Sequence, residues 1–341
     1  MMPIIAKRSP IGLDVGTHSV KAVQSVRGRR GWEVAVSTRF PRLNPGKPLT
    51  GEEAAELRSV LRRQGFSGSN AVVAANTEKV LTGTLELPAK KAGVPMDQIA
   101  RAEFARIHKC DLSAAQFAWW ELPAPARGGK GTHVMAIAYP HAEAESQLDV
   151  FDSAGFRVRA IKTTSDALGR VAMANAPGKS TVAVLDLGWK GTTLVLIRNG
   201  VVAYERNSAG AGLSALHATL ASRLRVDAAF VEELLGRSGM GPAPEDMATV
   251  AAEARPLIAV HMNAVIADVL KAIAYTSHQY PDAPVGVLLL TGGGSCIAGL
   301  DEFFASALGV EVRAANAGSG SDARGATSSH ACAIGLAGDL N

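Results

Sequence analysis

Two short segments of the chain place an aspartate at the end of an apolar stretch and a glycine two residues later. They read Asp14-Val-Gly-Thr-His-Ser-Val-Lys21 and Asp186-Leu-Gly-Trp-Lys-Gly-Thr-Thr193. A glycine turn lets backbone N–H groups approach phosphate oxygens, and the hydroxyls of Thr17 and Ser19 would add donors. An aspartate does not lie against bare phosphate, so Asp14 would need a Mg²⁺ ion, bound partly through water. The two segments predict phosphate-binding loops on opposite walls of a cleft.

A third glycine-rich segment, Leu288-Leu-Leu-Thr-Gly-Gly-Gly-Ser-Cys-Ile297, follows another apolar stretch. Its consecutive glycines, Gly292, Gly293 and Gly294, would leave no Cβ where a flat base or a ribose can lie. Each segment alone is also typical of an ordinary tight turn, because a single glycine motif is weak evidence. Together, and in this order after apolar strands, the three segments favour a nucleotide site.

The elements that would carry the two aspartate segments repeat along the chain. Alternating and apolar patterns predict strands at 11–16, 19–26 and 32–40, and again at 182–186, 192–198 and 201–206. Asn199-Gly200 is a two-residue hairpin signal. Thr50, with Glu53 three residues later, forms a capping-box pattern, in which each residue caps the other's backbone amide, and this pattern opens a predicted helix over 50–64. Further strands are predicted at 71–75 and 285–290, and a further helix at 300–308. The repetition predicts an α/β fold of two similar halves around a cleft.

Residues 79–156, between the two halves, do not follow the repeated pattern of strands. Strands are predicted there at 80–87, 116–122 and 132–139, and helices at 96–109 and 142–154. We interpret this stretch as an inserted small subdomain. The chain would then divide into a first lobe (1–78, 157–180 and 322–341), the insert (79–156) and a second lobe (181–321).

Composition limits the possible functions of the chain. It has 341 residues, of which 47% are hydrophobic and 19% charged. This composition supplies enough apolar residues for large buried cores and excludes a disordered chain. A net charge of +4 without a basic stripe argues against nucleic-acid binding. Three distant cysteines and scattered histidines predict neither disulfides nor a zinc site. The apolar window 256–275 contains four polar or charged residues, so we expect an amphipathic helix of a soluble, cytoplasmic protein without a signal peptide.

The three glycine segments resemble the motifs of the actin-like ATPase superfamily, which includes sugar kinases, heat-shock ATPases, actin and FtsA. Ile11 to Lys21 resembles the first phosphate motif, Asp186 to Thr193 the second, and Leu290 to Gly294 the adenosine motif. Within the superfamily the chain is most similar to the PilM family of type IV pilus assembly. The insert and the segment from Arg206 to Gly212 favour that family.

The resemblance implies a duplicated actin-like (ribonuclease H-like) fold, with two lobes around a nucleotide cleft and an inserted small subdomain. It implies ATP and Mg²⁺ as cofactors, with Asp14 and Asp186 beside the metal. The implied nucleotide-binding residues are Asp14, Gly16, Thr17, Ser19, Lys21, Asp186, Gly188, Lys190, Thr192, Gly292, Gly293 and Gly294.

The resemblance also implies a partner. This would be a PilN-like bitopic inner-membrane protein whose short cytoplasmic N-terminal tail docks near the insert, in a complex with other pilus or secretion assembly proteins. The protein would then be cytoplasmic and peripheral at the inner membrane, reaching the membrane through its partner. An aromatic anchor for that tail is predicted at Trp119 or Trp120.

Some residues depart from the superfamily pattern. Trp189 and Lys190 occupy the second phosphate loop, where small residues are usual, and Leu235 stands where a lysine often lies beside the nucleoside. We therefore expect nucleotide binding without appreciable hydrolysis. The alternatives are a small-molecule kinase or ATPase of the same superfamily, which would need an acceptor pocket and a positioned carboxylate, and a filament protein like FtsA. No C-terminal membrane-targeting helix like that of FtsA is evident in the sequence.

Overall fold

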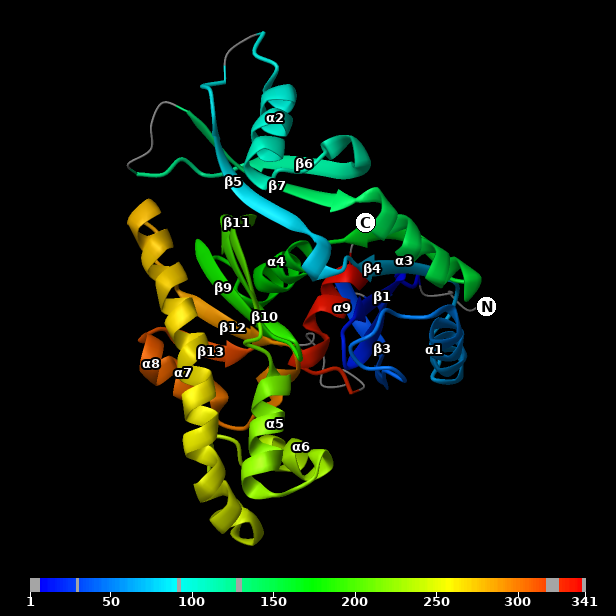
Figure 1. The fold of residues 1–341 in the computed structure, drawn as a ribbon, viewed down its shortest axis with the longest axis vertical. Coiled ribbons are helices and arrows are strands. Elements are labelled where there is room, and N and C mark those ends of the chain that lie inside the picture. Colours follow the sequence, from blue (N-terminus) through cyan, green and yellow to red (C-terminus); the bar gives the residue numbers. More distant parts are fainter. Residues whose placement is uncertain (1–6, 29–30, 91–92, 127–130, 317–324, 339–341) are drawn as a thin grey trace.

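The first lobe is built on a five-stranded sheet with the strand order β3-β2-β1-β4-β8. The computed structural model describes residues 7–28, 31–90, 93–126, 131–316 and 325–338 (Figure 1). Antiparallel hairpins join β1 to β2 and β2 to β3, and β4 and β8 add in parallel. The strands are β1 (Ile11–Val15), β2 (Ser19–Gly28), β3 (Gly31–Pro41), β4 (Asn70–Ala74) and β8 (Arg157–Lys162).

The second lobe repeats this pattern in the strand order β11-β10-β9-β12-β13. Its strands are β9 (Thr181–Leu187), β10 (Gly191–Arg198), β11 (Val201–Ala209), β12 (Val287–Thr291) and β13 (Glu311–Ala314). The first three again form antiparallel hairpins, and the last two again add in parallel. The duplicated α/β fold predicted from the two aspartate segments is confirmed.

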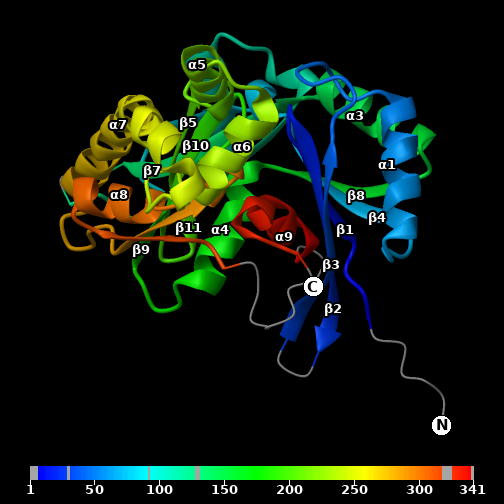
Figure 2. The same cartoon turned by 90° about the horizontal axis from the view of Figure 1, so that it is seen from below.

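Two helices cross between the sheets and join the lobes. Helix α4 (Thr164–Asn175) packs on the second sheet, and α9 (Ala331–Ala337) packs on β1, β2 and β4 of the first, so that α9 lies in the middle of the molecule (Figure 2). A Cβ on Gly12 would collide with the carbonyl of Ala333, and one on Gly335 with that of Ala167. Helix α9 can therefore approach both β1 and α4 this closely because both positions are glycine.

The insert is a three-stranded antiparallel sheet covered by one helix. The strand order is β5-β7-β6, formed by β5 (Leu81–Leu87), β7 (Thr132–Pro140) and β6 (Ala115–Glu121), and the sheet packs on α2 (Met96–His108). Leu87, Phe104 and Phe117 form its small core. This core is separate from that of the first lobe, as expected for an inserted subdomain.

The packing of α3 (His141–Ser153) changes where we place one boundary of the insert. Helix α3 packs on α1 (Gly51–Arg63), and its Phe151 is buried with Leu57 and Phe156 in the core of the first lobe. The sequence pattern assigns α3 to the insert, with its boundary at residue 156. Because a helix belongs with the core that buries its apolar face, we now propose that the insert ends near Pro140.

The outer layer of the second lobe consists of α5 (Leu213–Leu224), α6 (Ala228–Arg237), α7 (Ala248–Gln279) and α8 (Leu300–Leu308). By length and composition alone, α7 is the one helix of the described residues that could cross a membrane. Its inward face, with Ile258, Met262 and Val265, is buried in the core of the second lobe. This packing agrees with the amphipathic helix predicted over 256–275.

The insert also touches the second lobe. The Trp120 indole N–H donates to the Val202 carbonyl at 2.8 Å. The Tyr280 hydroxyl donates to the Pro123 carbonyl at 3.1 Å, and the Ala126 amide donates to the Gln279 carbonyl at 2.9 Å. The insert is thus tied to the second lobe at β11 and at the C-terminal end of α7.

Candidate functional site

The two aspartate segments form matching tight hairpins. The Gly16 amide donates to the Ser19 carbonyl at 3.1 Å, and the Gly188 amide donates to the Gly191 carbonyl at 3.0 Å. A Cβ at Gly16 or Gly188 would lie 2.8 Å from the acceptor carbonyl of its own turn. The turns therefore require glycine, as the sequence suggested, and leave a backbone surface without side chains where a phosphate can approach.

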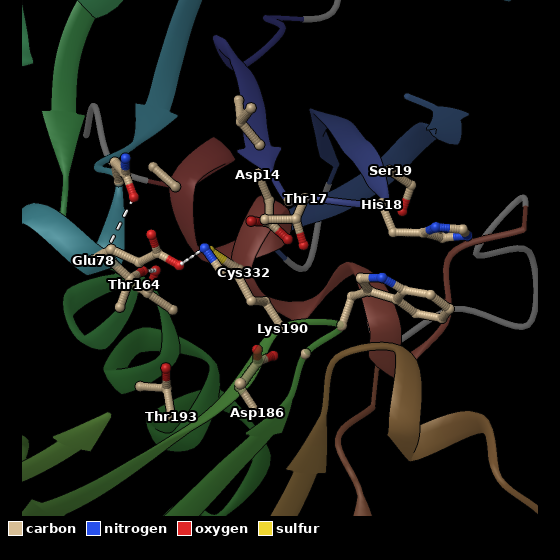
Figure 3. A pocket seen from close by; sticks show the side chains of 18 of the residues that line it. Asp14, Thr17, His18, Ser19, Glu78, Thr164, Asp186, Lys190, Thr193 and Cys332 are labelled. Atoms are coloured by element: carbon tan, nitrogen blue, oxygen red, sulfur yellow. Dashed lines mark hydrogen bonds and ion pairs between the residues drawn. The ribbon is translucent and has the colours of Figure 1, made fainter. Parts of the chain in front are cut away.

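The carboxylates of the two hairpins point into the same space. Figure 3 shows Asp14 and Asp186 reaching toward each other from β1 and β9. The Lys21 ammonium donates to Asp14 Oδ2 at 3.3 Å and interacts electrostatically with Asp186. Sequence reasoning placed these three residues at one site, and the fold brings them together.

Burial strengthens the electrostatic interactions among Asp14, Lys21 and Asp186. Burial alone would lower the pKa of Lys21, but the carboxylates of Asp14 and Asp186 outweigh it and raise that pKa. Burial raises the pKa of Asp186, and the Lys21 ammonium opposes that rise. A divalent cation placed beside the two carboxylates would favour their charged forms.

The third glycine segment touches the second hairpin. The Thr291 hydroxyl donates to Asp186 Oδ1 at 3.0 Å, and a Cβ on Gly292, whose φ is +76°, would lie 2.8 Å from the same oxygen. Gly292 and Gly294 are buried against Asp186 and Leu187, whereas Gly293 is exposed and lines the cleft. Of the three glycines, Gly293 is therefore the one that presents bare backbone to the cleft.

The cleft between the hairpins continues past the phosphate loops. It is one cavity of about 1280 Å³ that runs from Gly293 and Leu235 of the second lobe, between Asp14 and Asp186, to Tyr139 and Val150 beside the insert. Of the residues predicted to bind nucleotide, Thr17, Ser19, Gly188, Lys190 and Thr192 line it. One continuous space thus joins the predicted nucleotide site to a groove between the first lobe and the insert.

Contacts between opposite walls close part of this cleft. The His18 ring stacks on Trp189 at a centroid distance of 4.2 Å, and Arg39 pairs with Glu232 at 2.8 Å. The Lys190 ammonium pairs with Glu78 at 2.6 Å (Figure 3). Lys190, expected to contact phosphate, therefore has a protein partner in this structure.

The sequence did not identify His18, Arg39, Glu78, Glu232 or His217 as residues of the cleft. The His217 ring meets Trp189 edge-on at 4.8 Å. The one usable signal was the position of Glu232 in the segment from Val231 to Leu235, which the superfamily pattern places beside the nucleoside. The other residues reach the cleft through contacts between lobes, which no local pattern encodes.

The residues fit a Mg²⁺ ion that is bound with a nucleotide, and do not form a closed metal cage. Among the described residues no group of three or more His, Cys, Asp or Glu side chains could hold a metal. Asp14 and Asp186 offer carboxylates, and Mg²⁺ commonly takes one or two of these together with phosphate oxygens and water. The bare turns of Gly16 and Gly188 flank the carboxylates and could accept the phosphates.

The duplicated lobes, the crossing helices and the cleft between two glycine hairpins define an actin-like protein. The family model described as type IV pilus assembly protein PilM matches residues 12–337. The chain therefore belongs to the PilM family.

Solved structures agree with this fold. The PilM-PilN type IV pilus biogenesis complex matches with a TM-score of 0.73 at 19% identity, over 96% of this chain and 97% of that one. The ethanolamine utilization protein EutJ from Carboxydothermus hydrogenoformans matches with a TM-score of 0.57 at 15% identity, over 98% of this chain and 91% of that one. MreB 5 of Spiroplasma citri bound to AMPPNP matches with a TM-score of 0.55 at 13% identity, over 95% of this chain and 93% of that one. A comparison with curated proteins found no match.

Acid should destabilise the fold through its histidines. Burial lowers the pKa of His18, His108, His217, His261 and His330. A histidine with a folded-state pKa below the unfolded value of about 6.5 binds more protons in the unfolded chain as the pH falls, so the free energy of unfolding should decrease from pH 7.5 to 5.5. The raised pKa values of Asp186 and Glu205 would make acid stabilise the fold. They concern only two carboxyl groups, however, and the pKa of these groups in the unfolded chain is near 4.

Urea unfolding at pH 7.5, 6.5 and 5.5 measures this dependence. His330 is the informative position, because its ring is buried and its Nε2 has no hydrogen-bond partner among the described residues. The variant His330→Gln, which cannot titrate, should show a shallower decrease than wild type. Equal stability at all three pH values would contradict the prediction.

Proposed function

We propose that this PilM-family chain is a nucleotide-binding scaffold of a type IV pilus or type II secretion-like complex. It would bind Mg-ATP in the cleft and hold the cytoplasmic tail of a PilN-like inner-membrane protein in the adjoining groove. The observation that carries the proposal is the single cavity that runs from the paired phosphate hairpins to the groove beside the insert. The protein would then be cytoplasmic and reach the inner membrane through this partner.

The nucleotide would use both walls of the cleft. Its phosphates would approach the turns of Gly16 and Gly188, with Mg²⁺ beside Asp14 and Asp186. The nucleoside would lie over Gly293, where an added Cβ would meet nothing closer than Leu213 at 3.5 Å, with Leu235 and Gly236 on the other side. Leu235 supplies apolar contact and no hydrogen bond. Binding without appreciable turnover remains our expectation, because Trp189 stands in the second phosphate loop, stacked on His18, and phosphoryl transfer depends on close positioning of the phosphates.

The partner's tail would lie in the groove between α3 and the insert. Leu81, Thr82, Tyr139, Gln147 and Val150 line this groove, which combines apolar side chains with hydrogen-bonding groups. Strand β5 is an edge strand of the insert sheet, so an extended peptide could add to it through backbone hydrogen bonds.

The two tryptophans proposed as anchors for the tail are engaged within the chain. The Trp119 indole N–H donates to Asp97 at 3.2 Å, and its ring packs on the core of the insert. Trp120 binds the second lobe through Val202. Neither tryptophan lines the groove, whereas Leu81 does, so apolar residues of the groove, with Leu81 first, are better candidates for anchors. Trp120 becomes a link between the insert and the second lobe.

This link gives the nucleotide a route to the partner. The groove has one wall on the first lobe and the other on the insert, and the insert is tied to the second lobe near Val202 and Gln279. Any change in the angle between the lobes would therefore move one wall of the groove against the other. A nucleotide with different affinities for the two arrangements would then change the affinity for the tail.

Binding of the tail should depend on the groove. We would immobilise the short cytoplasmic tail of a genetically neighbouring bitopic membrane protein and measure the affinity of the full chain. Leu81→Arg places a charge in the groove and should weaken binding by about 30-fold, on the order of 2 kcal/mol. The matched control is Ile107→Arg, which changes an apolar residue of the same subdomain that is 50% exposed outside the groove. Equal loss in both variants, or none in Leu81→Arg, would place the dock elsewhere.

A further inference from the structure

An ion pair across the cleft joins the second phosphate loop to the first lobe. The Lys190 ammonium pairs with the Glu78 carboxylate at 2.6 Å (Figure 3). Glu78 belongs to the short 3₁₀ turn Thr77–Lys79, which leads from β4 of the first lobe into β5 of the insert. Both charged residues line the cavity that also contains Asp14 and Asp186. The pair therefore connects a predicted phosphate site with the segment that begins the insert.

The backbone around Lys190 is held by other contacts. The Gly210 amide donates to the Lys190 carbonyl at 3.1 Å, and the neighbouring Trp189 ring stacks on His18. These contacts fix the backbone of the loop, whereas a lysine side chain carries its ammonium on a flexible four-carbon stem. Lys190 can therefore change its partner by rotating its side chain, without a rearrangement of the hairpin.

Separation of the pair would leave neither charge buried. The Lys190 side chain is 55% exposed and that of Glu78 is 53% exposed. Exposed ion pairs of this kind are weak, because water solvates both partners. Glu78 would also keep a cation nearby in Lys79. A hydrogen bond to Glu143 is the main cause of the raised pKa of Lys79, and the charge of Glu78 adds to it.

A phosphate at the second hairpin would compete with Glu78 for the ammonium. Lys190 follows Gly188 by two residues in the same turn, where the bare backbone leaves room for a phosphate to approach. Hydrogen bonds between charged groups are the strong ones, and a phosphate offers several oxygens. If the ammonium held both anions at once, it would draw the Glu78 carboxylate toward the phosphate, and the like charges would repel each other. The two anions therefore exclude each other as partners of Lys190.

We propose that Lys190 exchanges Glu78 for a phosphate group of the nucleotide, so that Glu78 acts as an internal competitor that lowers nucleotide affinity. The inference rests on the proposed function, because it requires Mg-ATP to bind in the cleft. It gives a regulatory role to Lys190, which stands where the superfamily pattern has a small residue. The exchange also frees the second phosphate loop from the turn Thr77–Lys79, so nucleotide removes one contact between the second lobe and the start of the insert.

Calorimetric titration of the full chain with Mg-ATP tests the exchange. Glu78→Gln should bind about threefold more tightly than wild type, because Lys190 is then free to meet the phosphate. Lys190→Gln should bind about tenfold more weakly, because it loses a charged hydrogen bond. The matched control is Glu121→Gln. Glu121 pairs with Lys90, also at 2.6 Å, and is 47% exposed outside the cleft, so this variant should bind like wild type.

The double variant Glu78→Gln/Lys190→Gln separates the exchange from a general effect of charge. Removal of a negative charge near the phosphates would favour an anionic ligand whether or not Lys190 is present, whereas the exchange predicts no gain from Glu78→Gln once Lys190 is glutamine. Thermal melts without nucleotide would show that all variants fold.

The outcomes distinguish the exchange from the proposed function. An equal gain from Glu78→Gln in both backgrounds, or no gain in either, would overturn the exchange while leaving Mg-ATP binding in place. A wild-type chain that does not bind Mg-ATP would refute the proposed function and the exchange with it.

Discussion

Replacing Asp14 with asparagine should remove most of the rise in melting temperature that Mg-ATP gives the wild-type chain. At a ligand concentration 100 times the dissociation constant, binding stabilises a fold by about 2.7 kcal/mol, which corresponds to a rise of several degrees. The substitution keeps the shape of the side chain but removes the charge that would face Mg²⁺. Thermal melts with ATP and Mg²⁺ together, and with ATP alone, measure the effect.

The matched control is Asp166→Asn. Asp166 also pairs with basic side chains, Arg170 at 3.3 Å and Lys162 at 3.7 Å, but it is on α4 outside the residues that line the cleft. This variant should keep the full Mg-ATP shift. An undiminished shift in Asp14→Asn would refute the assignment of Asp14 to the metal.

A second large effect is expected at a buried ion pair that supports the first hairpin. Arg42 Nε donates to Glu53 Oε1 at 2.7 Å, and the two side chains are 3% and 1% exposed. Arg42 also donates to the carbonyls of Gly16 at 3.2 Å and Lys47 at 2.8 Å. Arg42→Met would leave the Glu53 carboxylate buried without its cation, so the free energy of unfolding should fall by about 3–5 kcal/mol.

Urea unfolding measures this loss. Arg101→Met is the matched control, because Arg101 pairs with Asp97 at 2.8 Å on the surface, where an ion pair contributes about 0.5 kcal/mol or less. The double variant Arg42→Met/Glu53→Leu should recover much of the stability by removing the stranded charge. A loss in Arg42→Met no larger than in Arg101→Met would show that the buried pair does not stabilise the fold.

The sequence was sufficient for the duplicated fold because the pattern is local. An apolar strand that ends in Asp-x-Gly, followed by hairpin strands, occurs twice, and both hairpins close with the same backbone hydrogen bond. The predicted capping of α1 was half right. The Thr50 hydroxyl accepts from the Glu53 amide at 3.2 Å, but the Glu53 side chain turns to Arg42 rather than back to Thr50.

Contacts between distant segments could not be predicted in this way. The stack of His18 on Trp189 joins residues 171 positions apart, and the position of α3 depends on which core buries Phe151. Both depend on how the lobes meet in space. The contacts of Trp119 and Trp120 could not be predicted for the same reason, because a tryptophan pair in a strand indicates large apolar side chains but not what covers them.

The measurement that tests the central claim most directly is the affinity of the chain for the partner's tail with and without saturating Mg-ATP. If one continuous cleft couples the two sites, nucleotide should change the tail affinity by about fivefold or more, and the tail should change the nucleotide affinity by the same factor. Trp120→Ala, which removes the link to Val202, should reduce this coupling while both ligands still bind. An unchanged tail affinity, in a chain whose melting temperature shows that Mg-ATP is bound, would contradict the account.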